Sequence, residues 1–373
     1  MANENLSSAK AAKNDEFYTQ WADIEREMSA YLEYNPDVFR DKTILLPCDD
    51  PEWSNFTKFF TLHFEKFGLK KLISTSYAPD SNREGAYYKP TLFDAQQFDE
   101  SKDMAHGKLF ILEPKDISGD GKIDLDDLQW EYLISDGDFR SPEVTKLRDE
   151  ADIIITNPPF SLFREFVTWI MEGDKQFSVV GSGNAITYKE IFPLIKQNKM
   201  WRGRGFKKGD AYFGVPESTR SDYAAGVYDA STQLVHFRNC AWYTNLDHGR
   251  RHEPLKLMTM EENIKFHKGL RGHPFHRYDN YNAIEVPFTD AIPSDYTGAM
   301  GVPISFLEKY NPDQFEIIGI TDRGNEYGLK TREYDPKVTP KASDLNRRAA
   351  IKLSDGSLSS TYARLLIRWK VTQ

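Results

Sequence analysis

The chain has 373 residues, a formal net charge of −9 at pH 7 and two cysteines. Two cysteines exclude a disulfide framework and a four-cysteine zinc site, and they are typical of a cytoplasmic protein. No apolar run approaches membrane-spanning length, and the polar N-terminus does not resemble a signal peptide. The acidic balance disfavours a general nucleic-acid coat protein, although local clusters of basic residues can still bind nucleic acid.

The N-terminal part of the chain predicts a disordered segment followed by a helix. We expect residues 1–13 to be a disordered lead. Phe17, Tyr18 and Thr19 stand just before a helix that we expect to end near Leu32. Aromatic and hydroxyl groups in this position either contact a ligand or fix the N-terminus to the core.

The first convincing strand is Thr43–Leu46, and Lys71–Ser76 is the second. A polar turn that contains Asp49 and Asp50 follows the first strand and leads into an aromatic helix. Open α/β sheets bind nucleotide-like ligands at such turns. This turn has no glycine, and its two carboxylates would repel phosphate. The turn therefore favours a ligand with an amino group or a ribose, such as S-adenosyl-L-methionine, over NAD or ATP.

A calcium-loop pattern occurs in the acidic region that follows. Its acidic and small residues have the spacing of an EF-hand loop: Asp116, Ser118, Asp120, Gly121, Asp124 and Asp127. The last position has Asp where a bidentate Glu is usual, and the flanking residues predict strands instead of paired helices. A surface hairpin turn is the favoured interpretation, with calcium binding as the alternative. Further on, Asp138 and Phe139 are placed either to meet a purine or to form a capped loop.

The central feature is a strand at 153–155 that ends in Asn157-Pro158-Pro159-Phe160. Three consecutive Ile residues predict a strand buried on both faces, and the prolines cannot continue it. Apolar residues at helical spacing follow, so the local order is strand, stiff turn and helix. An amide and an unpaired carbonyl would then lie at the carboxyl end of a parallel strand. Asn and Pro are also common in ordinary turns, but the flanking elements favour a functional site.

These four residues suit a reaction in which an electrophilic group is transferred to an exocyclic amine, such as that of adenine. The lone pair of such an amine is delocalised into its ring, so the amine is a poor nucleophile. The Asn157 side-chain oxygen and the Pro158 carbonyl can each accept one N–H and favour a tetrahedral nitrogen. Their effect is largest as positive charge develops in the transition state. Phe160 can stack on the base that carries the amine.

Basic residues interleaved with aromatics predict nucleic-acid contacts in the second half of the chain. They occur after the last α/β elements and in segments from about residue 248, where helix–strand alternation fades. Late strands are expected at 315–320 and 364–369. Three histidines in this region lack companion ligands, which disfavours a metal site. The candidate DNA-binding residues are Arg202, Arg204, Lys207, Lys208, Arg250, Arg251, Lys268 and Arg271.

Taken together, these segments resemble the EcoRI-type adenine-specific DNA methyltransferases, from Asn14 to about Trp369. The strings that carry the resemblance are Asn-Asp-Glu-Phe-Tyr-Thr (14–19), Cys-Asp-Asp-Pro-Glu-Trp-Ser-Asn-Phe (48–56), Gly-Asp-Phe-Arg-Ser (137–141), Asn-Pro-Pro-Phe-Ser-Leu-Phe-Arg-Glu-Phe (157–166), Asn-Ala-Ile-Thr-Tyr-Lys-Glu-Ile-Phe (184–192), Trp-Tyr-Thr-Asn-Leu (242–246), Tyr-Asp-Asn-Tyr-Asn-Ala-Ile (278–284) and Gly-Val-Pro-Ile-Ser-Phe-Leu (301–307).

The resemblance implies an α/β fold with a Rossmann-like class I methyltransferase sheet and a C-terminal α+β target-recognition region. It implies a methyltransferase domain at 14–247, a DNA-binding region at 248–373, S-adenosyl-L-methionine as methyl donor and double-stranded DNA as partner. Residues 17–19 would line the methionine end of the cofactor, Asp138 and Phe139 would meet its adenine, and residues 157–160 would hold a flipped adenine.

We also expect a cytoplasmic monomer with no membrane association. Its activity is either paired with that of a cognate restriction endonuclease, which would not be a bound subunit, or it belongs to an orphan or mobile-element enzyme. Two alternatives remain at this stage. One is an RNA or protein-glutamine N-methyltransferase, because a glutamine amide nitrogen is also conjugated. The other is a non-catalytic DNA-binding protein that retains the fold.

Overall fold

The computed structural model describes residues 17–51, 53–78, 99, 102, 105–206, 209–215, 217, 220, 223, 226–322 and 327–370. The expected lead at 1–13 lies outside these residues, as do Lys207 and Lys208. The chain divides into two compact units, one of residues 1–184 and 202–248 and the other of residues 185–201 and 249–373. The division falls beside the expected boundary at 247, but residues 185–201 group with the second unit.

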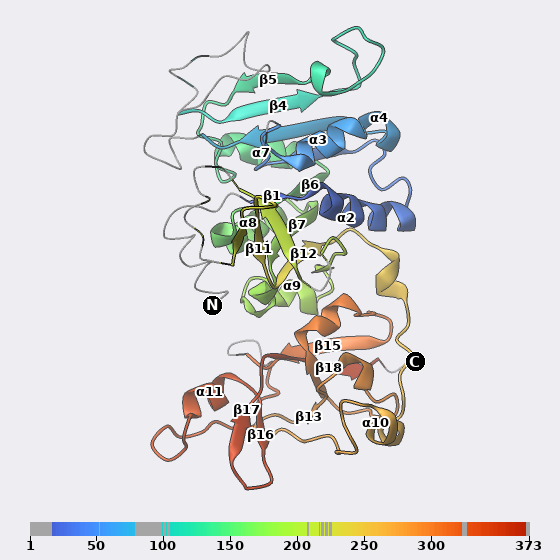
Figure 1. Ribbon diagram of the computed structural model, residues 1–373, viewed down its shortest axis with the longest axis vertical. Helices are drawn as coiled ribbons and strands as arrows, with labels where there is room; N and C mark the ends of the chain where they lie inside the picture. The colour runs from blue at the N-terminus through green and yellow to red at the C-terminus, as the bar shows by residue number, and fades with distance from the viewer. Residues whose placement is uncertain are drawn as a thin grey trace. The chain divides into compact units, whose positions relative to one another are not determined.

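The first unit is built on a mixed sheet that Figure 1 shows between helices. Its strand order is β5 (Gln129–Tyr132), β4 (Lys108–Leu112), β3 (Lys71–Ser76), β2 (Thr43–Leu46), β6 (Ile153–Thr156), β7 (Gln176–Ser182), β12 (Cys240–Thr244) and β8 (Trp201–Arg202). The four central strands of this order, β3, β2, β6 and β7, are parallel to one another. In contrast, β4, β5 and β12 each pair antiparallel with the preceding strand in the sheet. All residues of β2 and β6 are buried, because helices cover both faces of the sheet.

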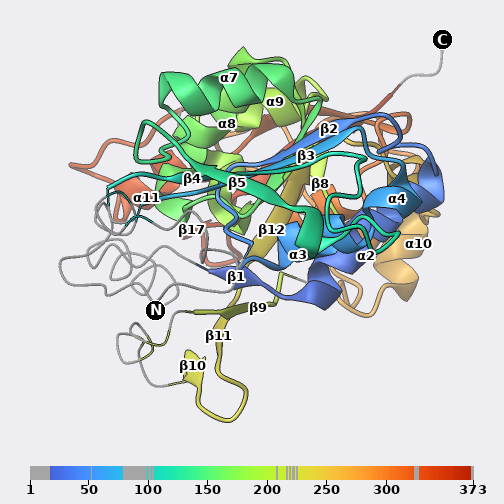
Figure 2. The same cartoon turned by 90° about the horizontal axis from the view of Figure 1, so that it is seen from above.

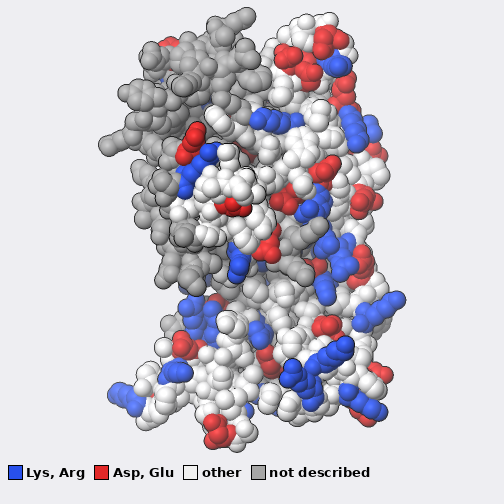
Figure 3. All heavy atoms as spheres, in the orientation of Figure 1, with Lys and Arg blue, Asp and Glu red and all other residues white. Residues whose placement is uncertain are grey.

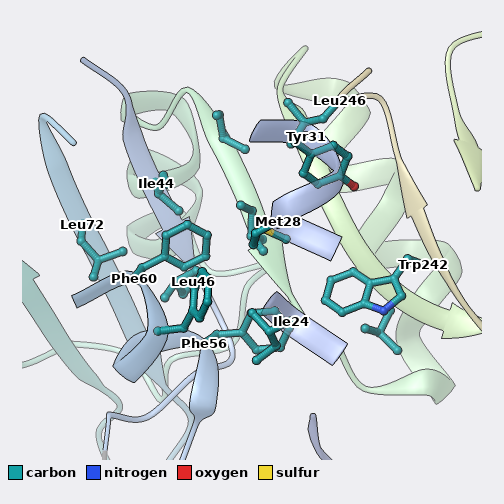
Figure 4. Packing of buried hydrophobic residues seen from close by; sticks show 14 of the residues in the cluster. Ile24, Met28, Tyr31, Ile44, Leu46, Phe56, Phe60, Leu72, Trp242 and Leu246 are labelled. Carbon is teal, nitrogen blue, oxygen red and sulfur yellow. The ribbon is translucent and has the colours of Figure 1, made fainter. Parts of the chain in front are cut away.

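Helices lie on the two faces of this sheet, as Figure 2 shows. One face carries α7 (Pro142–Glu150) and α8 (Phe163–Glu172), and the other carries α2 (Trp21–Tyr34), α3 (Asn55–Leu62) and α4 (Phe64–Phe67). In α8 the buried residues recur every three to four positions, which gives the helix one apolar face. Between α2, α3 and the sheet, Met28, Phe56 and Trp242 pack into a continuous core (Figure 4).

A second sheet in this unit holds the N-terminal residues. Its order is β1 (Tyr18–Thr19), β9 (Ala211–Gly214), β11 (Leu234–Phe237) and β10 (Tyr228–Asp229), all antiparallel. β11 therefore belongs to this second sheet, whereas β12 belongs to the main sheet. Burial alternates along β11, so it covers the core with one face only, whereas the mostly buried β12 pairs with β7.

The second unit combines two sheets with short helices. One sheet has the order β13 (Ile284–Glu285), β14 (Met300–Pro303), β18 (Arg364–Trp369) and β15 (Phe315–Ile320), and the other pairs β16 (Ala350–Lys352) with β17 (Leu358–Ser360). The helices are α9 (Phe192–Lys196), α10 (Met260–Phe266) and α11 (Ala342–Arg347). α9 begins one residue before Pro193, because proline fits the first turn of a helix and not its interior.

Residues 116–127, which have the spacing of a calcium loop, lie in the hairpin loop that connects β4 to β5. This agrees with the interpretation of the segment as a surface hairpin turn. The Asp127 carboxylate accepts the backbone N–H groups of Ile117, Ser118 and Asp124, and Asp116 accepts those of Gly119 and Gly121. Among the described residues, no group of three or more His, Cys, Asp or Glu is arranged to hold a metal. In the same residues, no helix has both the length and the apolar character that crossing a membrane requires.

Candidate active site

The candidate site lies where β2 and β6 end side by side. The two strands are parallel neighbours, and the order of strands along the chain reverses between them. Polar turns therefore emerge together at one edge of the sheet, which is where open α/β sheets bind ligands. Asp49 follows β2, and Asn157 follows β6. The two prolines end β6, and a 3-10 turn at Phe160–Leu162 leads into α8.

The two polar atoms of the Asn157 side chain differ in their hydrogen bonding. Its Nδ2 donates to the main-chain carbonyl of Phe17, 2.6 Å away. Its Oδ1 is buried, and no described residue hydrogen-bonds to it. A buried acceptor without a partner costs about 1–3 kcal/mol, so such atoms are rare unless a ligand completes them. The bond to Phe17 fixes the amide orientation and leaves the oxygen as the amide atom that no described residue binds.

Phe160 forms one wall of the site together with aromatic residues from distant segments. Its ring centroid lies 5.7 Å from that of Phe17 and 6.3 Å from that of Phe213. Phe17 also meets Phe237 edge-on at 4.9 Å. Phe17 is buried, whereas Phe160 is only partly buried. The cluster therefore holds Phe160 from behind and leaves part of its ring available to a planar ligand.

The N-terminal strand β1 places Tyr18 and Thr19 near the start of α3. The Tyr18 ring stacks on Trp53 at 6.4 Å, and Trp53 itself is 55% exposed. The Thr19 carbonyl accepts a hydrogen bond from Asn55 Nδ2 at 2.8 Å. The Thr19 hydroxyl is buried with no hydrogen-bond partner among the described residues. It is thus a second buried polar atom that a ligand can satisfy.

The two acidic residues after β2 have different surroundings. The Asp49 carboxylate is buried and accepts hydrogen bonds from the hydroxyls of Ser54 and Thr156, each at 2.6 Å. Burial raises the pKa of Asp49 to about 7, although these two hydrogen bonds act in the opposite direction. Asp50 is half-buried, and its main-chain carbonyl accepts the N–H groups of Trp53 and Ser54. Asp49 is therefore held by protein groups, and Asp50 shapes the turn.

Asp138 and Phe139 also make contacts within the protein. The Asp138 carboxylate accepts from Arg140 through Nε at 2.9 Å and Nη2 at 2.6 Å. Partial burial acts to raise the pKa of Asp138, but the hydrogen bonds and charge of Arg140 lower it below its ordinary value. The Phe139 ring is buried edge-on against Phe166 at 4.9 Å and Trp169 at 5.6 Å.

Two of the candidate DNA-binding residues are used inside the fold. Arg202 donates to the Gly183 carbonyl and lies 4.5 Å over the Tyr243 ring, and Arg251 is buried 3.5 Å over the Trp201 ring. The backbone N–H of Arg204 binds the buried Glu27 carboxylate. In the view of Figure 3, basic and acidic side chains are interspersed over the described surface.

The remaining described candidates lie at the surface of the second unit. Arg250 is partly exposed and pairs with Glu253. Lys268 and Arg271 are exposed in the turn after α10. Among the described candidates, Lys268 and Arg271 are therefore the two whose side chains are exposed.

Comparison with known proteins decides the family. The model of the family described as "Adenine-specific methyltransferase EcoRI" matches residues 5–370. The chain is 42% identical over 317 residues to the Type II methyltransferase M.EcoRI of Escherichia coli, covering 85% of this chain and 89% of the relative. This chain belongs to the EcoRI adenine-specific methyltransferase family. The recognition made from its sequence strings is thereby confirmed.

Two further relatives of this EcoRI-family methyltransferase come from mycoplasmas. M.MpnI of Mycoplasma pneumoniae is 32% identical over 88% of this chain and 90% of its own length. M.MgeORF184P of Mycoplasma genitalium is 32% identical over 98% of both chains. Both are named Type II methyltransferases. No solved structure matches the chain.

Sequence reasoning missed three residues of this EcoRI-family site. Ser54 and Thr156 bind the Asp49 carboxylate, and Asn55 binds β1 through the Thr19 carbonyl. Ser54 and Asn55 belong to one of the strings that carry the family resemblance, and Ser54 has the sequence position of a helix N-cap. Thr156 had no local signal, because its role depends on a partner in a neighbouring strand.

Proposed function

We propose that this adenine-specific methyltransferase transfers a methyl group from S-adenosyl-L-methionine to N6 of an adenine in DNA. The observation that carries the proposal is the buried Oδ1 of Asn157 at the end of β6, to which no residue in the described part of the chain hydrogen-bonds. An acceptor in that position fits an amine donor and does not fit a carbonyl or phosphate oxygen. Adenine N6 is an amine of this kind.

The residues of the turn act on the nitrogen during transfer. Asn157 Oδ1 accepts one N–H of the adenine amine, and the Pro158 carbonyl accepts the other. Both bonds strengthen as the nitrogen gains positive charge, so they stabilise the transition state more than the ground state. The bond from Nδ2 to Phe17 keeps Asn157 in place while this happens.

Phe160 stacks on the adenine. Its ring is supported from behind by Phe17 and Phe213 and needs no rearrangement to receive a planar base. Taking a base out of a duplex costs a few kcal/mol, and stacking of about 1–3 kcal/mol offsets part of that cost. The adenine must leave the helix before its amine can reach Asn157.

The first unit has groups that fit the methyl donor. When bound, S-adenosyl-L-methionine supplies a methyl group that is activated by its sulfonium centre. The buried Thr19 hydroxyl, which has no hydrogen-bond partner among the residues that the structure describes, would bind its polar end. The glycine-free turn at Asp50 suits its amino group better than it would suit a phosphate. We propose a Rossmann-like class I arrangement for this unit, because its parallel strands have helices on both faces and reverse order between β2 and β6.

We propose that the second unit recognises the target DNA. Arg250, Lys268 and Arg271 place positive charge at its surface, although the chain as a whole is acidic. Contacts of this kind would bind phosphates and hold the duplex while the adenine leaves it. A monomer suffices for this scheme, since every group named so far comes from one chain.

Methyl transfer to unmethylated genomic DNA, followed by mass spectrometry of the nucleosides, tests this proposal. We expect N6-methyladenine with the wild-type protein and almost none with Asn157→Ala. Methylation of RNA, or of a glutamine-containing peptide, without methylation of DNA would establish the alternative enzyme. Binding of S-adenosyl-L-methionine without transfer to any of the three substrates would establish a non-catalytic DNA-binding protein.

A further inference from the structure

A closed ring of hydrogen bonds joins three segments around the candidate site. The first segment is the N-terminal strand β1 with Phe17, the residue before it. The second runs from Asp49, in the turn after β2, to Asn55, the first residue of α3. The third is the end of β6 with Asn157, the residue after it. The bonds run from Asn157 Nδ2 to the Phe17 carbonyl, from the Thr156 hydroxyl to Asp49 Oδ2, from the Ser54 hydroxyl to Asp49 Oδ1, and from Asn55 Nδ2 to the Thr19 carbonyl.

Asp49 is the member of the ring that joins the two turns. Each of its carboxylate oxygens accepts one hydroxyl, so the carboxylate bridges Ser54 and Thr156. Ser54 is the N-cap of α3, because its Oγ also accepts the N–H of Phe56 at 3.0 Å. The Asp49 side chain is only 4% exposed, which leaves little room for it to contact a ligand directly. Its hydrogen-bonding capacity is directed at the protein.

Thr156 connects Asp49 to Asn157, whose side-chain amide acts in the proposed reaction. It is the last residue of β6 and directly precedes Asn157. The prolines that follow end the ladder, so β6 pairing alone does not hold the turn beyond Thr156. The bond to Asp49 fixes Thr156 from the β2 side, and the bond to Phe17 fixes Asn157 from the β1 side.

We propose that Asp49 is a positioning residue. Through its hydrogen bond to Thr156 it holds Asn157 at a fixed position relative to the turn after β2, where the methyl donor would bind. The proposal rests on the adenine-N6 function described above. In this role Asp49 touches neither the base nor the donor. It makes the two halves of the site one rigid unit, so that the amine meets the methyl group at the required distance. Misplacement of about 1 Å typically costs about 100-fold in rate.

The test replaces the Thr156 hydroxyl with a methyl group of similar size. Thr156→Val is expected to lower kcat roughly 10- to 100-fold and to change the Kd of S-adenosyl-L-methionine less than about threefold. Thr156→Ser keeps the hydroxyl and should restore most of kcat. Thr61→Val is the matched control, because Thr61 is also buried and no described residue hydrogen-bonds to its hydroxyl. Asp49→Ala removes the acceptor altogether, so adding Thr156→Val to Asp49→Ala should lower kcat no further, because the bond that it breaks is already absent.

Hydrogen exchange of the backbone amides of residue 157 and residues 160–163 gives a readout that does not depend on activity, since the two prolines between them have no N–H. Thr156→Val should exchange faster there than the wild type, whereas Thr156→Ser and Thr61→Val should not. Unchanged kcat and unchanged exchange in Thr156→Val would overturn the inference, and so would an equal loss of kcat in Thr61→Val. If the wild-type protein methylates no DNA, the proposed function fails, and the exchange data still decide whether Asp49 holds the turn.

Discussion

The side chain of Asn157 donates a hydrogen bond to the main-chain carbonyl of Phe17, although 140 residues separate them in the sequence. This bond determines which atom of the amide faces the substrate. An asparagine that was free to rotate could present its NH₂ group, which would oppose the amine of adenine. The N-terminal segment therefore orients the side chain of Asn157, the residue that we propose to act on the adenine amine.

Replacing Asn157 should remove catalysis with little effect on binding. Because Oδ1 is needed mainly in the transition state, Asn157→Ala is expected to lower kcat about 10²–10³-fold. The Kd values for DNA and S-adenosyl-L-methionine should change little. Single-turnover methylation measures the first quantity, and equilibrium titration measures the second. Asn35→Ala, at an exposed position after α2, is the control. An unchanged kcat with a weakened DNA Kd would contradict the assigned role.

Glu27 is expected to hold the loop that carries Arg204. Its buried carboxylate accepts the hydroxyls of Tyr31 and Ser178 and the backbone N–H groups of Arg204 and Gly205. In Glu27→Gln an NH₂ group replaces one of the two acceptor oxygens. It then meets either the two backbone N–H groups, which cannot accept, or the two hydroxyls, which must turn to accept. We therefore expect the free energy of unfolding to fall by about 1–3 kcal/mol, measured by chemical denaturation.

Glu33→Gln is the control for this change, because Glu33 is exposed on the same helix. It should unfold as the wild type does. If Glu27→Gln and Glu33→Gln had equal stability, the buried carboxylate would not be holding the loop.

Asp49 should make the protein less stable as the pH rises towards neutrality. Burial raises its pKa from 3.8 to about 7 in the folded state, so between these values the folded protein binds more protons than the unfolded chain. The free energy of unfolding should therefore fall with increasing pH in this window, by on the order of 4 kcal/mol in total. Asp49→Asn should remove this part of the slope.

Denaturation at pH 5 and pH 7, at constant ionic strength, measures the difference between Asp49→Asn and the wild type. Burial also raises the pKa of Glu27, so the wild-type slope contains a contribution of the same sign from that residue. Only the difference between the two proteins reports on Asp49. Equal slopes would mean that Asp49 does not titrate in this range.

The exposed basic residues after α10 should contribute to DNA binding through phosphates. The double variant Lys268→Gln, Arg271→Gln is expected to weaken DNA binding at low salt. It should also reduce the slope of log Kd against log salt by about 1.8, if each residue contacts one phosphate. Lys115→Gln with Lys122→Gln is the control, since both are exposed in the β4–β5 hairpin loop. A salt slope equal to that of the wild type would exclude these residues from the interface.

The sequence by itself determined the local elements and the chemistry of the central turn. Buried strands such as Ile153–Thr156 are readable because consecutive apolar β-branched residues suit only a strand covered on both faces. The Asn157–Phe160 turn is readable because proline constrains the backbone whatever surrounds it. The family strings added the reaction class, and the comparisons confirmed it.

Only the tertiary structure decided which polar groups are available and which are occupied. Asp49 and Asp50 are adjacent acids in the sequence, yet one is buried between two hydroxyls and the other shapes a turn. Arg202 and Arg251 resemble other basic residues of their segments, but each stacks on an aromatic ring inside the fold. These differences depend on partners from distant strands and helices. A hydrogen bond or a stacking contact is set by distance in space, and residue spacing along the chain does not give that distance.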